Sequence, residues 1–243
     1  MKKSKHYITR KLHRYFGVFI GIQFFFWTLG GLYFSWNNMK DVHGKTLLDK
    51  TEHTFAFSYD KHVAKLLDTV PEPIENITGI VVNTDSILRV KTIAGLYLLQ
   101  LNNEQNPISK GLTEKQIKSF VESRLKTNIS IRKMEFLDKN DISKDHEYRE
   151  KPLPVYAVHL EHPTNTNVYV HPHLAKITSV RNDNWRRFDF LWMLHVMDFE
   201  TRDHITNWIL RIFSVLGLVT ITSGFYLFYL SLPTIRKIKK RIT

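Results

Sequence analysis

Cysteine is missing from this 243-residue chain. Its absence excludes a disulfide-stabilised scaffold, a zinc site with cysteine ligands, an iron–sulfur protein and a thiol enzyme. The motifs of common soluble enzymes are missing as well, since the sequence contains no G-x-S-x-G, H-E-x-x-H, Walker A or G-x-G-x-x-G pattern. No serine lies in a recognisable nucleophile–base arrangement. We therefore expect no catalytic residues of the soluble-enzyme type.

Acidic residues are missing from both ends of the chain, which hold most of its positive charge. The net charge is +12, and residues 1–16 and 231–243 together carry 11 basic residues and no acidic residue. The remainder of the chain is almost balanced in charge. A nucleic-acid-binding protein would carry the excess on a folded domain, so we expect no nucleic-acid partner.

Charged residues are missing from two long runs, residues 15–39 and 212–235. A membrane-spanning helix needs about 20 mostly apolar residues, and both runs are long enough. Buried core helices are one alternative, but in a small soluble domain they would carry polar faces. A cleaved signal peptide has an apolar stretch of only about 7–15 residues, and no small-x-small cleavage site follows the first run. We predict transmembrane helices at 17–36 and 209–232.

The basic flanks predict the orientation of these two helices. Basic residues favour the cytoplasmic side of a membrane, which places the tails 1–16 and 233–243 in the cytoplasm. Residues 40–182 then lie outside the cytoplasm, and the lipid bilayer is the first partner. We expect a multi-pass protein of the cytoplasmic (inner) membrane with both termini inside.

The central segment contains the same order of elements twice, which predicts an α+β fold of helices packed on antiparallel sheet. The first repeat covers about 55–101, and the second covers about 113–181 and opens with a capping box at Thr113–Gln116. Apolar spacing predicts the elements in each repeat. They are a helix at 59–68 and strands at 76–83, 86–92 and 95–101, then a helix after Thr113 and strands at 130–137, 154–161, 166–171 and 177–181. The charged residues 138–151 predict a surface loop, and 185–204 an amphipathic helix on the outer membrane surface.

Three segments resemble the PepSY family and the transmembrane proteins associated with it. They are KLHRYFGVFIGIQFFFWTLGGLYF (11–34), VYAVHLEHPTNTNVYVHPHLAKITSV (155–180), and FLWMLHVMDF (190–199) with the TSG of the second apolar run (222–224). The order of the segments carries the resemblance, which covers most of the chain. The sequence departs from the family at one turn, where the usual acidic-x-x-Thr-Gly is replaced by His171-Pro172-His173-Leu174-Ala175-Lys176.

The resemblance implies three functions. The first is a non-enzymatic accessory role toward an envelope protein, in iron uptake or redox physiology. The second is a haem-bearing membrane subunit that reduces ferric iron or its siderophore complexes, with haem b as the cofactor. The third is a membrane module that restrains a peptidase. We favour the first, and the second is the only one that would make the chain an enzyme.

Two histidines near the predicted spans are candidate haem ligands. His13 opens the first span, and His195 precedes the second. Neutral imidazole is a common axial ligand of haem iron, although an interfacial histidine is the ordinary interpretation of His13 and membrane-surface packing that of His195. The predicted topology puts the two on opposite sides of a bilayer core about 30 Å thick. Each would therefore need a partner from a second copy or from another histidine-bearing subunit.

Two further histidines are a candidate metal site on the second sheet. If residues 163–167 form a symmetric turn, His159 faces His171 across neighbouring strands with Cβ atoms about 5 Å apart. Two imidazoles so placed could share a metal ion. The alternative is an exposed polar face, because Tyr156, Val158 and Leu160 already supply an apolar one.

Overall fold

The computed structural model describes residues 5–103, 108–126, 128–202 and 204–233. The chain divides into two compact units, one formed by residues 1–37 with 187–243 and the other by residues 38–186. The outer parts of the two predicted basic tails, residues 1–4 and 234–243, lie outside the described residues. The predicted α+β class with two antiparallel sheets and two long apolar helices is confirmed.

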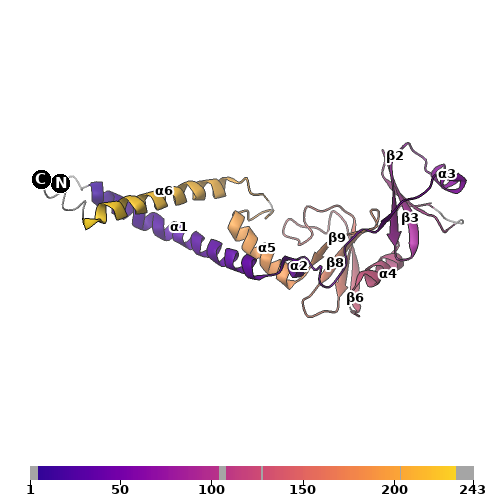
Figure 1. Cartoon of the computed structure of the whole chain (residues 1–243), viewed down its shortest axis with the longest axis horizontal. Helices are drawn as coiled ribbons and strands as arrows, with labels where there is room; N and C mark the ends of the chain where they lie inside the picture. The colour runs from indigo at the N-terminus through magenta and orange to yellow at the C-terminus, as the bar shows by residue number, and fades with distance from the viewer. Residues whose placement is uncertain (1–4, 104–107, 127, 203, 234–243) are drawn as a thin grey trace. The chain divides into compact units, whose positions relative to one another are not determined.

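The first unit, which we call the helical unit, contains α1 (Lys5–Trp36), most of α5 (Asp183–Val196) and α6 (Trp208–Ser231). Helices α1 and α6 pack against each other (Figure 1). Both are long and apolar enough to cross a membrane. Helix α1 begins 12 residues before the predicted span at 17–36, because the basic segment preceding that span is itself helical.

The amphipathic helix predicted at 185–204 is shorter than expected and ends at Val196. The next residue, Met197, has a positive φ of 54°, which an α-helix cannot continue through. Asp198 then accepts hydrogen bonds from the backbone N–H groups of Glu200, Thr201 and His204. These bonds satisfy backbone donors that a longer helix would have paired internally, so the segment turns back toward α6.

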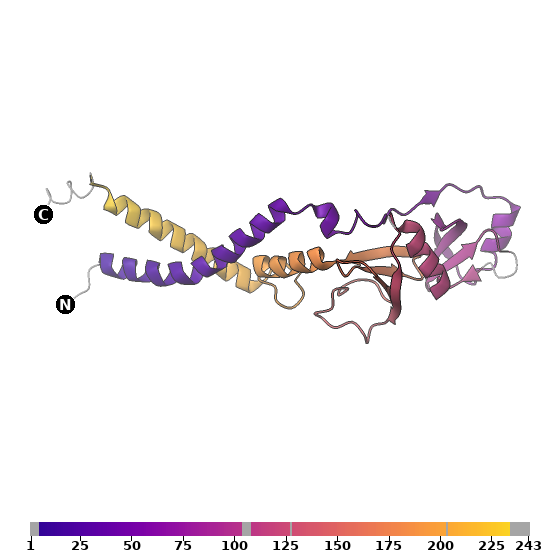
Figure 2. The same cartoon turned by 90° about the horizontal axis from the view of Figure 1, so that it is seen from below.

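The second unit, which we call the sheet unit, contains the two antiparallel sheets (Figure 2). Its first sheet has the order β1-β2-β3-β4-β5 and its second the order β6-β7-β8-β9, and all neighbouring strands are antiparallel. The elements are α2 (Met39–Val42), β1 (Thr54–Phe55), α3 (Lys61–Leu67), β2 (Ile74–Val82), β3 (Asp85–Thr92), β4 (Leu96–Gln100), β5 (Ile108–Ser109), α4 (Glu114–Arg124), β6 (Ile131–Leu137), β7 (Val155–Leu160), β8 (Asn167–His171) and β9 (Lys176–Arg181). The capping box predicted at the start of α4 is present.

The two sheets of this unit share one hydrophobic core. Ile80 and Leu98 of the first sheet, Phe120 of α4, and Val158 and Val180 of the second sheet are all buried in it. Helix α3 covers the opposite face of the first sheet, over a separate core. Neither sheet could bury its apolar face alone, so the two sheets depend on each other for stability.

The charged segment 138–151 is more than a surface loop, because it covers the outer face of the second sheet. Tyr148 is fully buried there and stacks on Tyr169, with ring centroids 4.6 Å apart. The Tyr148 hydroxyl donates to the Pro152 carbonyl oxygen, and it lies 2.8 Å from the Thr178 hydroxyl. The segment is a loop, as predicted, but it also covers part of the second sheet, where Tyr148, Val155, Ala157 and Tyr169 form a small core of their own.

The segment after α2 lies against β9. The Asn182 side chain donates to the Asp41 carbonyl oxygen at 2.8 Å. Gly44 has a φ of 68°, and a Cβ built on it would lie only 2.4 Å from Val180 Cγ1. A residue with a side chain would therefore meet both backbone strain and a steric clash at this position.

Candidate functional site in the helical unit

Two glycines on α6 face side chains of α1. Gly217 and Gly224 are seven residues apart, so they lie on the same face of the helix. A Cβ on Gly217 would be 3.8 Å from the Phe24 ring, whereas one on Gly224 would be 3.2 Å from Cε1 of His13. The imidazole of His13 thus fills the space that the missing side chain of Gly224 leaves.

A hydroxyl on α6 fixes the orientation of the His13 ring. Nδ1 of His13 lies 2.8 Å from the Ser223 hydroxyl oxygen, and that hydroxyl donates its proton to the Thr220 carbonyl oxygen at 2.8 Å. When that hydroxyl donates its one proton to Thr220, Nδ1 of His13 is the donor of the pair, and in that tautomer the lone pair of the ring lies on Nε2.

The last three carbonyl groups of α5 are satisfied by side chains from the other two helices. Gln23 donates to the carbonyl oxygen of Leu194 at 2.7 Å, and the indole N–H of Trp27 donates to that of His195 at 2.9 Å. Asn207, the N-cap of α6, donates to the carbonyl oxygen of Val196 at 2.8 Å. The end of a helix leaves its last carbonyls without intrahelical partners, so these three donors stabilise the end of α5 against α1 and α6.

The His195 ring lies in an aromatic cluster between α5 and α1. Trp192 stacks on it, and Trp27 and Phe34 of α1 have ring centroids 5.5 and 6.2 Å away. Its Nδ1 is buried and has no hydrogen-bond partner. The face of α5 that we expected to meet lipid or the sheet domain instead packs on α1.

The structure separates His13 and His195 along α1. His195 packs on Trp27, which is 14 residues from His13, or about 21 Å along the helix. Both belong to the helical unit, and they are closer than the full bilayer core we expected. His13 and His195 are still too far apart to bind the same iron, so they form separate sites.

As donors for a haem iron, the two histidines differ. His13 offers Nε2, while its Nδ1–H is held by Ser223, an arrangement typical of metal-ligating imidazoles. Nδ1 of His195 is closed off by aromatic rings, so it could reach an iron only if that cluster opened. His13 therefore has the supporting hydrogen bond of an iron ligand, although its Cε1–Nε2 edge lies against Gly224, whereas Nδ1 of His195 is enclosed by aromatic rings.

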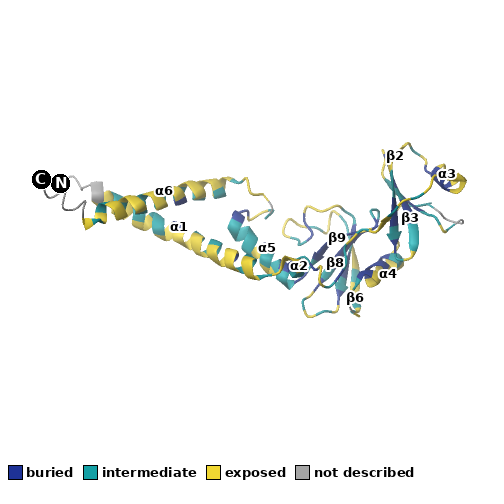
Figure 3. Ribbon diagram, in the orientation of Figure 1, coloured by how far each residue is buried: buried dark blue, intermediate teal, exposed yellow. Residues whose placement is uncertain are grey.

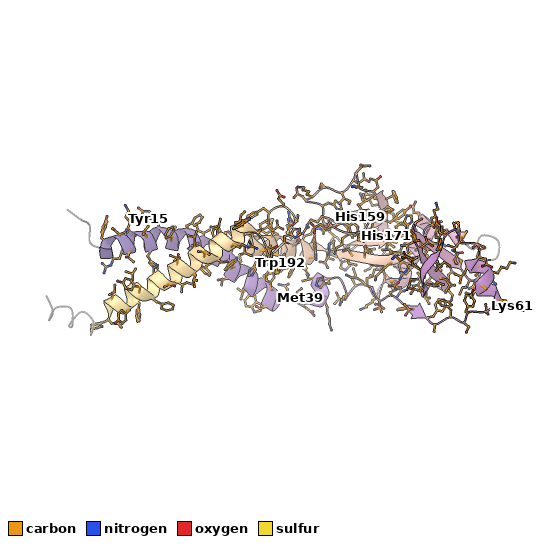
Figure 4. All side chains as sticks on the ribbon, turned by 90° about the horizontal axis from the view of Figure 1, so that it is seen from above. Tyr15, Met39, Lys61, His159, His171 and Trp192 are labelled. Carbon is orange, nitrogen blue, oxygen red and sulfur yellow. The ribbon has the colours of Figure 1, made fainter. Side chains whose placement is uncertain are left out.

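The predicted pairing of His159 with His171 was wrong. Both lie in the second sheet, but His159 pairs with Asn167 on β8, and His171 would extend the same register opposite Val155 (Figure 4). The turn covers the residues between Leu160 and Asn167, so it is not centred on 163–167 as we assumed. The two histidines are therefore about 13 Å apart along the strands, too far to share one metal ion.

Each of these histidines has a partner of its own. Nε2 of His159 lies 3.0 Å from a carboxylate oxygen of Glu135, and hydrogen bonds from Lys133 and His159 lower the pKa of that carboxyl group. His171 is 6% exposed, and its Nδ1 accepts the N–H of Leu174. Burial lowers the pKa of His171, and His173 lowers it further. Within the described residues, no group of three histidine or acidic side chains could hold a metal ion.

Sequence reasoning missed three residues that organise this site: Gln23, Ser223 and Asn207. Gln23 carries the only side-chain amide within the predicted span 17–36, which is a signal that could have been noticed, because a polar group in such a span needs a partner. Ser223 and Asn207 carry no comparable signal, since serine and asparagine are common near helix ends and in apolar helices.

Comparison of the chain with protein-family models, with curated proteins and with solved structures gives no significant match in any of the three. The resemblance to PepSY proteins therefore stays a prediction from the sequence segments quoted above.

Proposed function

We propose that this chain is an integral protein of the cytoplasmic membrane. In this proposal α1 and α6 form a transmembrane hairpin, and residues 38–186 are a non-enzymatic binding module outside the cytoplasm. The iron or redox setting of that module rests on the PepSY resemblance alone. The observation that carries the proposal is the exposure of apolar side chains on α1 and α6 (Figure 3).

These helices present large apolar groups to the surroundings all along their length. Only 11% of the most apolar stretch of each helix is buried, although core helices of soluble proteins are mostly buried. Val18, Phe25, Leu218 and Phe228 are all between 64% and 68% exposed. Leaving such a side chain in water costs about 1.5–3 kcal/mol, so a lipid environment stabilises the pair strongly.

The contacts of α1 argue against a cleaved signal peptide. Gln23 and Trp27 satisfy carbonyl groups of α5, and His13 is held by Ser223 of α6. Removal of α1 would leave those carbonyl groups without donors. In a bilayer, where no water can replace the donors, such contacts matter more than they would in solution.

Cysteine labelling tests the topology, and a chain without native cysteine suits it. The exposed Lys40 and Lys118 of the sheet unit are replaced by cysteine one at a time, as are Lys3 and Thr243 in the tails. We expect Lys40→Cys and Lys118→Cys to react with a membrane-impermeant maleimide in intact cells, and the tail variants to react only after permeabilisation. Reaction of a tail variant in intact cells would refute the orientation.

A second candidate function, haem binding, is favoured by the geometry of His13. Bound haem would supply one-electron transfer. Ser223 would hold the imidazole so that Nε2 faces the iron, and a second axial ligand would come from another copy or another subunit. This candidate corresponds to the ferric reductase alternative.

Optical spectra test the haem candidate independently of activity. Protein expressed with ample haem and purified in mild detergent should show a Soret band, which His13→Ala removes. Ser223→Ala should lower haem affinity roughly 10- to 100-fold, as loss of a supporting hydrogen bond does at other metal sites. The exposed His62 provides a matched control, since His62→Ala should change nothing. Wild-type protein without a Soret band would refute the candidate.

A further inference from the structure

A cleft of about 560 Å³ lies at one end of the first sheet, within the sheet unit. Its lining includes three cationic side chains, Arg89, Lys91 and Lys176, and none of the described lining residues is acidic. A volume of this size is typical of sites for small ligands or short peptide segments.

Strand register explains why these side chains point into the cleft. Arg89 pairs with Thr78 and Lys91 with Asn76, so all four side chains lie on the same face of the sheet. Further along β3 the same face carries Ile87, which is buried in the shared core. This face of β3 is therefore apolar at Ile87, where it contributes to the shared core, and cationic at Arg89 and Lys91, where it lines the cleft.

The turn between β8 and β9 forms one wall of the cleft. The carbonyl oxygen of Leu174 in this turn accepts a hydrogen bond from the guanidinium group of Arg89 at 3.0 Å. Lys176, just after the turn, supplies the third cation. The cleft is therefore built from both repeats, and neither repeat alone would form it.

The three cations share two carboxylates of the chain. Glu52 contacts both Arg89 and Lys176, and Glu75 contacts Lys91 at 2.7 Å. Lys91 is 62% exposed, so its pair with Glu75 is easily exchanged for another carboxylate. Neither of these carboxylates lines the cleft itself, so its described charged lining residues are all cationic, which favours an anionic ligand.

We propose that this cleft binds an extended acidic peptide segment of an envelope protein, with acidic residues at alternate positions; the choice of partner rests on the proposed function. Arg89 and Lys91 are two residues apart on β3, which places their attachment points about 6.7 Å apart. Alternate side chains of an extended peptide have the same spacing. Ile93, which is 76% exposed, and Leu96 add an apolar rim for an intervening aliphatic residue.

Peptide titration on the full-length protein in detergent tests this proposal. The probe is a fluorescent (Glu-Val)4 peptide, and the comparison is (Glu-Glu-Val-Val)2, which has the same composition but the wrong spacing. We expect the alternating peptide to bind at least 5-fold more tightly. Inorganic phosphate and citrate are added as competitors, and neither should displace the peptide at equal charge concentration.

Charge variants locate the binding to the cleft. Lys91→Gln should weaken binding roughly 2- to 5-fold, the effect of one exposed ion pair. Glu75→Gln should strengthen it by a similar factor, because it frees Lys91. Lys118→Gln, an equal charge change on the exposed face of α4, should have no effect.

Three results would overturn the cleft proposal: equal binding of the two peptides, equal effects of Lys91→Gln and Lys118→Gln, or displacement by phosphate as efficient as by peptide. None of them affects the labelling pattern of the cysteine variants, which tests the membrane topology alone. Conversely, if the tail variants react from outside the cell while the peptide still binds, the proposed topology is refuted and the proposal of peptide binding in the cleft is not.

Discussion

Replacement of Glu147 by glutamine should destabilise the sheet unit by removing one identifiable hydrogen bond. One carboxylate oxygen of Glu147 accepts bonds from Asn167 and from the Tyr169 hydroxyl, both at 2.7 Å, and the other accepts the Nε–H of Arg186 at 2.8 Å. Glutamine has a side-chain oxygen that can still accept the hydrogen bonds from Asn167 and Tyr169. Its NH2 group would face the Arg186 donor, so the charge-assisted bond is lost.

The cost follows from the exposure of the partners. A hydrogen bond to a charged group contributes about 1.5–3 kcal/mol. Arg186 is one third exposed and keeps its ion pair with Asp183, so we reduce the expected loss to about 1–2 kcal/mol. Glu147→Ala would also leave the buried Tyr169 hydroxyl without this acceptor, which raises the expected loss to about 3 kcal/mol or more.

Hydrogen exchange in strands β7 to β9 of the full-length protein in detergent measures this loss. A loss of about 1–2 kcal/mol corresponds to exchange roughly 5- to 30-fold faster for amides that exchange through opening of the sheet. Glu122→Gln, on the exposed face of α4, is the matched control and should not change the rates. Equal rates in Glu147→Gln and Glu122→Gln would refute the reasoning.

The difference between wild type and Glu147→Gln should also depend on pH. Burial alone would raise the pKa of Glu147, but the bonds from Arg186, Tyr169 and Asn167 outweigh it and lower the pKa. A carboxyl group whose pKa is lowered by folding stabilises the fold above its ordinary pKa, and this contribution is lost as the pH falls through the lowered value. The difference should be full at pH 7 and should shrink below about pH 4. A difference that does not shrink as the pH falls below about 4 would contradict the assignment.

Three further substitutions test other contacts. Gly44→Ala should destabilise the sheet unit by about 3 kcal/mol or more, because its Cβ would overlap Val180; urea unfolding measures this. Trp27→Phe removes the donor to the His195 carbonyl and should lower thermal stability in detergent by about 1 kcal/mol, and an unchanged transition would argue against that bond. Gly224→Val should push α1 away from α6 where Gly224 contacts the His13 ring. Disulfide cross-linking between cysteines introduced on the two helices should then give a lower yield than in the parent protein.

Much of the fold could be predicted because the signals for it are local. Two charge-free runs predicted α1 and α6, and alternation along 86–92 predicted β3 within one residue at its start. The capping box at Thr113 fixed the start of α4. Such patterns act through neighbouring residues, so no knowledge of distant contacts is needed.

The candidate site could be predicted only in part. His13 and His195 were identified because an ionisable residue beside an apolar run is unusual, but their surroundings were not. The ring of His13 is oriented by Ser223, which is 210 residues away, and the carbonyl of His195 by Trp27, 168 residues away. Nothing local in the sequence encodes a hydrogen bond at that separation.

The sequence by itself determined the α+β class, the two long apolar helices and the seven longer strands, whereas the two-residue strands β1 and β5 were not predicted. Tertiary structure decided how those segments align, as the β7–β8 register separated His159 from His171 and the buried Tyr148 brought a charged segment onto the second sheet. It also decided where α5 ends, since its last carbonyl groups find donors on α1 and at the start of α6. Helix and strand formation depend on neighbours in sequence, whereas register and helix ends depend on which distant polar groups must be satisfied.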